Sequence, residues 1–254
     1  MRRERSELVT LAVALLASLV LWNLPYVGIV LYPFKLLATW LHELSHGLIM
    51  IVTGAGFDHM IIYRDTSGLA YPSSDVGPFP SAVIAAAGYM GTPLWGGVLL
   101  VATRDGRTAR IALGVLAALL VATAILVIAP SPSGDSFGPW ATAAMGGVVA
   151  LCAIALPARW RLLVAHFIAA QACVNALLDI RVLFRPQQVV DGILQGRSDA
   201  HSMALLTFGT TDTWAVWTWA IAWLVWSLIV LFVAFRLSAS RARASAAPSA
   251  PTTV

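Results

Sequence analysis

The sequence predicts an all-α fold, a polytopic membrane helical bundle of about seven spans with a short β-hairpin after the second span. The chain of 254 residues is 59% hydrophobic and 11% charged, whereas roughly 25% of the residues in a soluble domain are charged. Its mean hydropathy of +0.82 agrees with a membrane protein. Its apolar runs are continuous and reach the ~20 residues that a helix needs to cross a bilayer, while outer-membrane strands alternate over about 10 residues.

Seven apolar stretches are long enough to cross a membrane as helices. The first follows a basic N-terminus, but no small-residue cleavage site comes after it, so we expect an uncleaved span rather than a signal peptide. The stretches predict one membrane domain over residues 1–237, followed by a disordered tail, 238–254, that is rich in Ala, Ser, Pro and Arg. The predicted spans cover residues 8–30, 34–53, 82–102, 110–129, 139–157, 161–184 and 214–236.

The basic residues indicate orientation rather than binding of nucleic acid. The chain has 16 Lys and Arg residues and a formal net charge of +4, and most of these residues lie in loops or tails, where they follow the positive-inside rule. Arginine clusters come after the third, fifth and seventh spans, so two helices separate each cluster from the next. All three clusters and the C-terminus are therefore expected on the cytoplasmic side. The side of the basic N-terminus stays open, because it depends on how often residues 7–53 cross.

The loop over residues 54–81 contains a predicted β-hairpin. Two strand-like runs, Met60 to Tyr63 and Leu69 to Tyr71, flank the turn sequence Asp65-Thr66-Ser67-Gly68,. An exposed strand edge at this place could hold an extended peptide by strand addition. The alternative is an ordinary connecting loop.

The second span contains the pentapeptide His42-Glu43-Leu44-Ser45-His46, which is a zinc-site signature,. On a helix the two histidines share one face, because they are four residues apart, and both imidazoles can reach a single metal ion. Glu43 lies beside that metal, where it can act as a general base toward a metal-bound water. Ionisable groups are costly in a membrane and usually mark a functional site there.

Two histidines leave a catalytic zinc one protein ligand short, since such sites usually have three ligands and an open position. The candidates for the third ligand all lie in the sixth span or in the loop after it: Asp179, Asp199, Asp191, His166 and His201. Asp191 can be a simple turn residue, and the two histidines fit a buried hydrogen-bonded side chain and a loop residue better than they fit ligands.

Asp179 ranks first among these candidates, because an acid toward the end of an apolar helix needs a specific partner. Its alternative role is an ion pair with Arg181 or Arg185 near the membrane surface. Asp199 ranks second, because Ser198 or Asp199 could instead cap a helix that begins near residue 200.

The third span contains a run of small residues, Gly88-Tyr89-Met90-Gly91-Thr92-Pro93. Small residues at this spacing let helices approach closely, and a proline permits a kink. We expect helix packing here, with a place in the wall of an active-site cavity as the sharper alternative.

These features together resemble the site-2-protease family of intramembrane zinc metalloproteases, in particular a short bacterial branch of it. The resemblance covers residues 35 to about 223. It rests on the pentapeptide, the hairpin, the small-residue run, Asn175 to Asp179, and Ser198-Asp199-Ala200. The better-known members have a Leu-Asp-Gly ligand motif preceded by an Asn and a Pro. Here the similar Val190-Asp191-Gly192 falls in a polar stretch rather than in a membrane helix, so this motif does not identify the third ligand.

The resemblance implies a zinc ion held by His42, His46 and an aspartate, Asp179 before Asp199, with Glu43 as the base. It also implies a membrane protein or peptide as substrate and a lipid bilayer, the bacterial cell membrane, as the surroundings. The alternative is a non-catalytic metal-binding membrane scaffold or transporter that keeps the bundle without turnover.

Overall fold

The computed structural model describes residues 27–184, 188–191, 193–195 and 198–246. Within this part the chain forms seven helices and two short hairpins, which confirms the predicted all-α fold with a hairpin after the motif helix. The elements are α2 (Val27–Val52), β1 (Phe57–Ile62), β2 (Gly68–Pro72), α3 (Pro78–Ala102), α4 (Gly106–Leu126), α5 (Phe137–Ala155), α6 (Ala158–Leu183), β3 (Gln188–Val190), β4 (Ile193–Gln195), α7 (Asp199–Phe208) and α8 (Thr213–Ala246).

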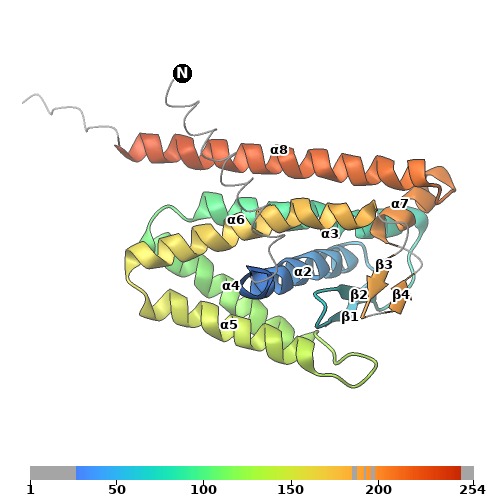
Figure 1. Ribbon diagram of the computed structural model, residues 1–254, viewed down its shortest axis with the longest axis horizontal. Helices are drawn as coiled ribbons and strands as arrows, with labels where there is room; N and C mark the ends of the chain where they lie inside the picture. The colour runs from blue at the N-terminus through green and yellow to red at the C-terminus, as the bar shows by residue number, and fades with distance from the viewer. Residues whose placement is uncertain (1–26, 185–187, 192, 196–197, 247–254) are drawn as a thin grey trace, which may run out of the picture.

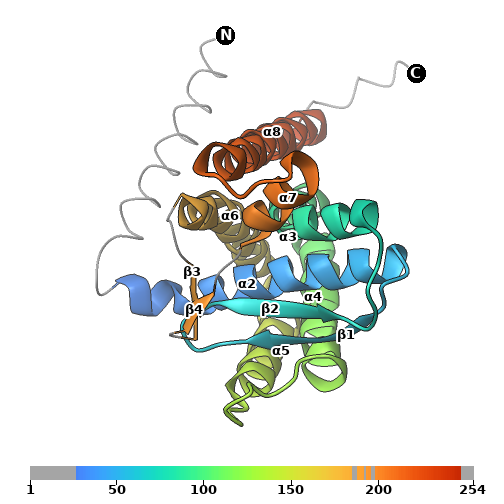
Figure 2. The same cartoon turned by 90° about the vertical axis from the view of Figure 1, so that its right-hand side faces the viewer.

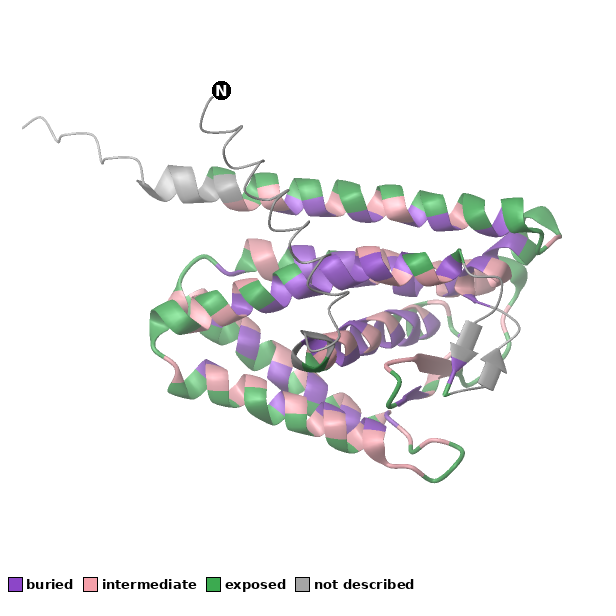
Figure 3. Cartoon of the chain, in the orientation of Figure 1, coloured by how far each residue is buried: buried purple, intermediate pink, exposed green. Residues whose placement is uncertain are grey.

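Five of the described helices, α3, α4, α5, α6 and α8, are long and apolar enough to cross a membrane, and they coincide with five of the predicted spans. Their outer faces expose large apolar side chains, such as Ile125 and Val148 (Figure 3). Such faces are stable in lipid, and the protein is an integral membrane protein. The predicted span 34–53 lies within α2, which is not one of the five, and 8–30 falls outside the described residues except for its last four.

The motif helix α2 lies across the bundle instead of along it. It is foreshortened in Figure 1 and fully extended in Figure 2, where α6 and α8 are seen nearly end-on. Buried polar contacts fix it in this place. The Trp40 indole donates a hydrogen bond to Thr123 Oγ1 on α4 (2.8 Å), and the Asn175 amide on α6 donates to the Phe34 carbonyl (3.1 Å).

The two ends of the bundle differ in what they carry. Figure 1 shows both hairpins and α7 at one end, while the α3–α4 and α5–α6 connections and the end of α8 lie at the other. Arg104 lies in the α3–α4 connection, and Arg159 lies in the first turn of α6, directly after the α5–α6 connection. The arginine clusters therefore gather at one end of the bundle, as the sequence predicted, and the motif lies toward the opposite end.

The first hairpin is attached to the α4–α5 connection through strand β1 and through its turn. Strand β1 pairs antiparallel with β2, and Met60 also bridges to Ile128 in the α4–α5 connection. At the tip, Arg64 Nε donates to Asp135 Oδ2 at 2.6 Å. The outer edge of β2 has no strand partner in the described part of the chain, so β2 is the strand that remains available for further pairing.

Two differences from the sequence-based expectations concern the C-terminal third. The stretch expected as a polar loop after the sixth span contains the β3–β4 hairpin, while the helix considered near residue 200 is present as α7, with Ser198 as its N-cap. Helix α8 continues to Ala246, so residues 238–246 are helical rather than part of a disordered tail. Ala and Arg, which are common in this stretch, have high helix propensity. The remaining tail residues, 247–254, lie outside the described part.

Candidate metal centre

Helix α2 brings both histidines and the glutamate of the pentapeptide to the same region of the site. Glu43 and His46 are buried, with exposed fractions of 5% and 6%. The approach of α3 depends on its glycines, because a Cβ atom at Gly88 would overlap the His42 imidazole and one at Gly91 would overlap the Ser45 hydroxyl. The small-residue run of α3 therefore has both roles that were considered from the sequence: it packs against α2, and it helps to enclose the site.

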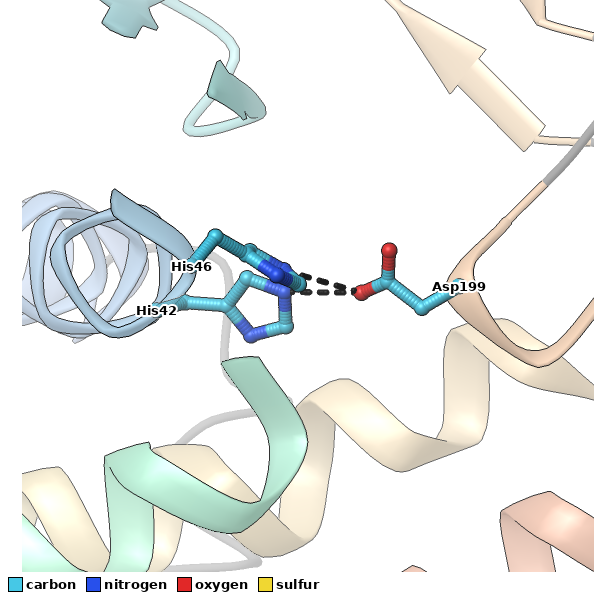
Figure 4. Close-up of side chains that lie close together, drawn as sticks. All are labelled: His42, His46 and Asp199. Atoms are coloured by element: carbon cyan, nitrogen blue, oxygen red, sulfur yellow. Dashed lines mark hydrogen bonds and ion pairs between the residues drawn. The ribbon is translucent and has the colours of Figure 1, made fainter. Parts of the chain in front are cut away.

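Helix α7 supplies a carboxylate to the same point. Ser198 is the N-cap of α7, and its hydroxyl accepts a hydrogen bond from the His201 backbone N–H in a capping box. Asp199 is the first residue of that helix, and an acidic side chain is favoured at a helix N-terminus. Its Oδ2 atom lies 3.1 Å from His42 Nε2 and 3.2 Å from His46 Nε2 (Figure 4).

The three side chains fit the donor set of a zinc site. Among the described residues, His42, His46 and Asp199 form the group whose ligand atoms lie within 4.8 Å of one another. In a tetrahedral zinc site, ligand bonds of 2.0–2.2 Å put two ligand atoms about 3.3 Å apart, close to the separations found here. The Nδ1 atom of His46 lies 2.7 Å from the Ile84 carbonyl, and an Nδ1–H donor there leaves Nε2 free for a metal.

The Asp199 carboxylate is held in its charged form. Burial alone raises the pKa of Asp199, but the charge of His46 and hydrogen bonds with both histidines keep that pKa well below its usual range. A metal ligand has to be deprotonated. The carboxylate of Asp199 is therefore deprotonated through its pairing with the two histidines.

A cavity of about 800 Å³ opens beside this group. Strand β2 forms part of its wall, and a Cβ atom at Gly68 would lie 2.8 Å from Glu43 Cγ. Strand β2 thus passes close to the carboxylate of the motif. The residues that line the cavity include His42, Glu43, Gly68, Tyr89, Asp179 and Asp199.

A sequence model of the family described as Peptidase M50B-like matches residues 10–234. The chain belongs to this family. Its membership confirms the resemblance to the site-2 proteases, which are zinc metalloproteases that act on membrane proteins. No curated protein and no solved structure matches the chain.

Asp179, the first-ranked third ligand, lines the cavity of this M50B-like chain but does not join the group of three. It lies near the end of α6, where it interacts electrostatically with His42, Lys35 and Arg181. The guanidinium of Arg181 donates to the Leu178 carbonyl (3.3 Å). Of the three aspartates considered from the sequence, the structure brings Asp199 to the histidines.

The other three candidates have different contacts. His166 Nε2 lies 3.0 Å from the Thr103 carbonyl, far along α6 from the site. His201 belongs to the capping box of α7, with Nδ1 at 2.8 Å from the Ser198 hydroxyl. The backbone N–H of Asp191 donates to Asp65 Oδ2 (2.9 Å), which links the second hairpin to the tip of the first.

Two residues of the M50B-like site were not singled out as functional from the sequence. Gly68 was assigned only to the turn, and Tyr89 only to the small-residue run. Nothing in the local pattern marks Gly68, because its closeness to Glu43 depends on how the hairpin folds back on α2. For Tyr89 there was a signal, since it is the one aromatic residue in a run of small residues on a helix expected to pack near the site.

Proposed function

We propose that this M50B-like protein is an intramembrane zinc metalloendopeptidase that hydrolyses peptide bonds of a membrane-associated protein or peptide. The observation that carries the proposal is the convergence of His42, His46 and Asp199 on one point beside the buried Glu43. A donor set of two imidazoles and one carboxylate is typical of catalytic zinc sites. The match to a family of zinc metalloproteases supports the same activity.

In this proposal His42, His46 and Asp199 hold zinc, and Asp179 stays outside the ligand set. When bound, zinc supplies a Lewis acid that polarises the scissile carbonyl and lowers the pKa of a coordinated water. The separations of 3.1 and 3.2 Å between Asp199 Oδ2 and the two Nε2 atoms support this assignment. It reverses the ranking of the two aspartates that the sequence favoured.

Glu43 moves the proton in the proposed reaction. Its carboxylate takes a proton from the attacking water while the water oxygen adds to the carbonyl carbon. Glu43 then gives that proton to the amide nitrogen as the C–N bond breaks. The products are a carboxylic acid and an amine, and Glu43 returns to its starting state.

The substrate segment has to be extended when it reaches the site. Strand β2 has one edge without a strand partner in the described part of the chain, and at Gly68 it passes close to Glu43. An extended segment that adds to this edge gains backbone hydrogen bonds in register with β2. A transmembrane substrate helix therefore unwinds locally before it is cut. We place the reaction in the bacterial cell membrane, from the resemblance to the short bacterial branch.

The test combines metal analysis with proteolysis of labelled casein in detergent micelles and of single-span reporter peptides in lipid vesicles. We expect about one zinc per wild-type chain, and loss of zinc in His42→Ala and in Asp199→Ala. Asp179→Ala, the matched control in the same cavity, keeps its zinc. Glu43→Gln also keeps zinc but loses cleavage, because a carboxamide cannot accept the proton of water.

Two outcomes contradict the proposal. Undiminished cleavage in Glu43→Gln removes the glutamate from the mechanism. A wild-type protein that binds zinc but cleaves no probe supports the alternative of a metal-binding membrane scaffold or transporter. If Asp179→Ala loses zinc and Asp199→Ala keeps it, the ligand assignment reverts to Asp179.

A further inference from the structure

Tyr89 is the aromatic side chain nearest to the metal-binding histidines on α3. Its ring meets the His42 imidazole edge-to-face, with centroids 4.7 Å apart and an interplanar angle of 88°. The approach is possible because Gly88, the residue before it, has no side chain to hold α3 away from α2. Tyr89 also lines the cavity that contains Glu43 and Asp199.

The Tyr89 ring is fixed in this place from its other side. Trp223 on α8 stacks on it with centroids 4.9 Å apart and an interplanar angle of 6°. Both aromatic side chains are buried, with exposed fractions of 9% for Tyr89 and 2% for Trp223. A ring held between an imidazole and an indole keeps one orientation, so its hydroxyl has a defined position before any substrate binds.

The hydroxyl of Tyr89 is a donor without an assigned acceptor. The structure gives it no hydrogen-bond partner among the described residues, and it is not one of the buried polar atoms sealed away without a partner. The carboxylates of Asp199, Asp179 and Glu43 all act on it electrostatically. Tyr89 lines the cavity and its hydroxyl is not sealed off, so the hydroxyl is accessible from the cavity.

Packing alone does not account for a tyrosine here. A phenylalanine would make the same edge-to-face contact with His42 and the same stack on Trp223. A hydroxyl that faces the cavity and has no hydrogen-bond partner among the described residues is available to donate to a ligand in that cavity,. The acceptor that the proposed reaction brings to this place is a peptide carbonyl.

We propose that the Tyr89 hydroxyl donates a hydrogen bond to the oxygen of the scissile carbonyl as negative charge develops on it. This role rests on the proposed peptidase function and adds a catalytic residue to it. As water adds to the carbonyl carbon and Glu43 takes the proton, the carbonyl oxygen becomes an anion. Tyr89 stabilises that oxygen and keeps its own proton, so the atoms and charges of the step balance without it.

The test compares Tyr89→Phe with the wild type, because this change removes only the hydroxyl. We expect one zinc per chain in both, a KM for labelled casein within about twofold, and a kcat lower by about 100-fold or more, as for the loss of one oxyanion donor. A labelled phosphonamidate peptide carries a tetrahedral, negatively charged phosphoryl group that mimics the species formed when water adds to the carbonyl carbon. This peptide should bind Tyr89→Phe more weakly than wild type by a similar factor. Tyr63→Phe is the control, because Tyr63 does not line the cavity.

Three outcomes overturn this role. A kcat of Tyr89→Phe within threefold of wild type shows that the hydroxyl does not act on the reaction. Loss of zinc in Tyr89→Phe shows that the hydroxyl supports the metal site instead. A higher KM with an unchanged kcat shows that the hydroxyl stabilises the bound substrate and the transition state to the same extent. A zinc-loaded wild type that cleaves no probe contradicts the proposed peptidase function itself. A wild type that cleaves the probes, beside a Tyr89→Phe variant that is equally active, contradicts only the role of Tyr89.

Discussion

Gly88, Gly91 and Gly68 determine how closely the neighbouring backbones approach the pentapeptide His42 to His46. The first two let α3 reach His42 and Ser45, and the third lets β2 reach Glu43. The Ser45 hydroxyl, which lies between the two histidines in sequence, also accepts a hydrogen bond from the Trp95 indole on α3 (3.1 Å). The rotamers of the motif are therefore set by close contacts with other elements as much as by α2 itself.

Replacement of Gly88 tests this dependence at the scale of one residue. We expect Gly88→Ala to lose most of its zinc, because the added methyl group overlaps the His42 imidazole. The loss should occur although alanine is favoured over glycine inside a helix by about 1 kcal/mol. Zinc content measured by mass spectrometry checks the result.

Gly114→Ala on α4 is the matched control for that experiment. A Cβ atom at this helical position meets nothing within 4 Å, so zinc content should not change and the thermal stability should stay equal or rise slightly. Zinc content equal to wild type in Gly88→Ala would show that α3 can move away without disturbing His42.

The sequence predicted the ligands on α2 but could not decide the third one. His42 and His46 follow from helical spacing alone, since residues four apart share a face in any α-helix. The third ligand depends on how a connection folds back to the motif. Asp179 and Asp199 both line the cavity, so their order was decided by the path of the chain between α6 and α7, which no local pattern encodes.

At the scale of elements, α7 is a helix of 10 residues whose first residue is Asp199 and whose end is the left-handed Gly209. A helix this short is marginal by itself, so it depends on its cap and on its packing against α3 and α8. Trp219 on α8 donates a hydrogen bond to Thr207 on α7 (3.0 Å). The position of Asp199 therefore depends on the stability of the helix that it begins.

Loss of the α7 cap should weaken zinc binding without removing a ligand. In Ser198→Ala the His201 backbone N–H loses its acceptor, at a cost of about 1 kcal/mol. If that cost falls on the bound state, zinc affinity drops about fivefold. Competition with a fluorescent zinc chelator measures the change.

Ser136→Ala is the matched control for the cap. Ser136 is the N-cap residue of α5, but its side chain makes no capping hydrogen bond there. Its replacement should leave zinc affinity and stability unchanged. Equal effects of the two substitutions would mean that the cap of α7 does not position Asp199.

The first hairpin should loosen in acid because of the Arg64–Asp135 pair. The hydrogen bond from Arg64 lowers the pKa of Asp135, so the pair contributes fully above the unfolded pKa of about 3.9. Its contribution is lost as the pH falls through the still lower folded pKa. The Ala129 N–H donates to the Met60 carbonyl next to the pair (2.9 Å), and its hydrogen-exchange protection should fall between pH 5 and pH 2.

The Arg64→Gln variant separates this effect from general acid unfolding. Without the guanidinium, the pKa of Asp135 loses its main lowering influence, and protection of Ala129 should be reduced already at pH 5 with little further fall. An identical pH dependence in wild type and Arg64→Gln would remove the pair as the cause.

At the scale of the whole molecule, the arginine clusters and the candidate metal centre lie toward opposite ends of the bundle. This arrangement was predictable in part. Composition and span length identified the helices that cross the membrane, and the arginine spacing placed three connections on one side. The path of α2 across the bundle was not predictable, because an apolar stretch of that length reads as one more span when its packing partners are unknown.

Thiol labelling tests the orientation of the molecule. In a background with Cys152→Ala and Cys173→Ala, we expect a membrane-impermeant maleimide added to intact cells to label Ser133→Cys, at the end that carries the centre. It should not label Arg104→Cys, at the end that the positive-inside rule assigns to the cytoplasm. Both positions are exposed. Labelling of Arg104→Cys alone would reverse the orientation.

The path of α2 across the bundle also bears on what becomes of the products. The cavity is bounded by the first residues of α3 and α7 and the last residues of α6, so a bond cut there lies close to one face of the bilayer. In the proposed reaction, the longer product of a transmembrane substrate would keep nearly its whole apolar stretch and stay anchored in lipid. The shorter product would retain too few apolar residues to remain, and it would leave into water on the side of the hairpins.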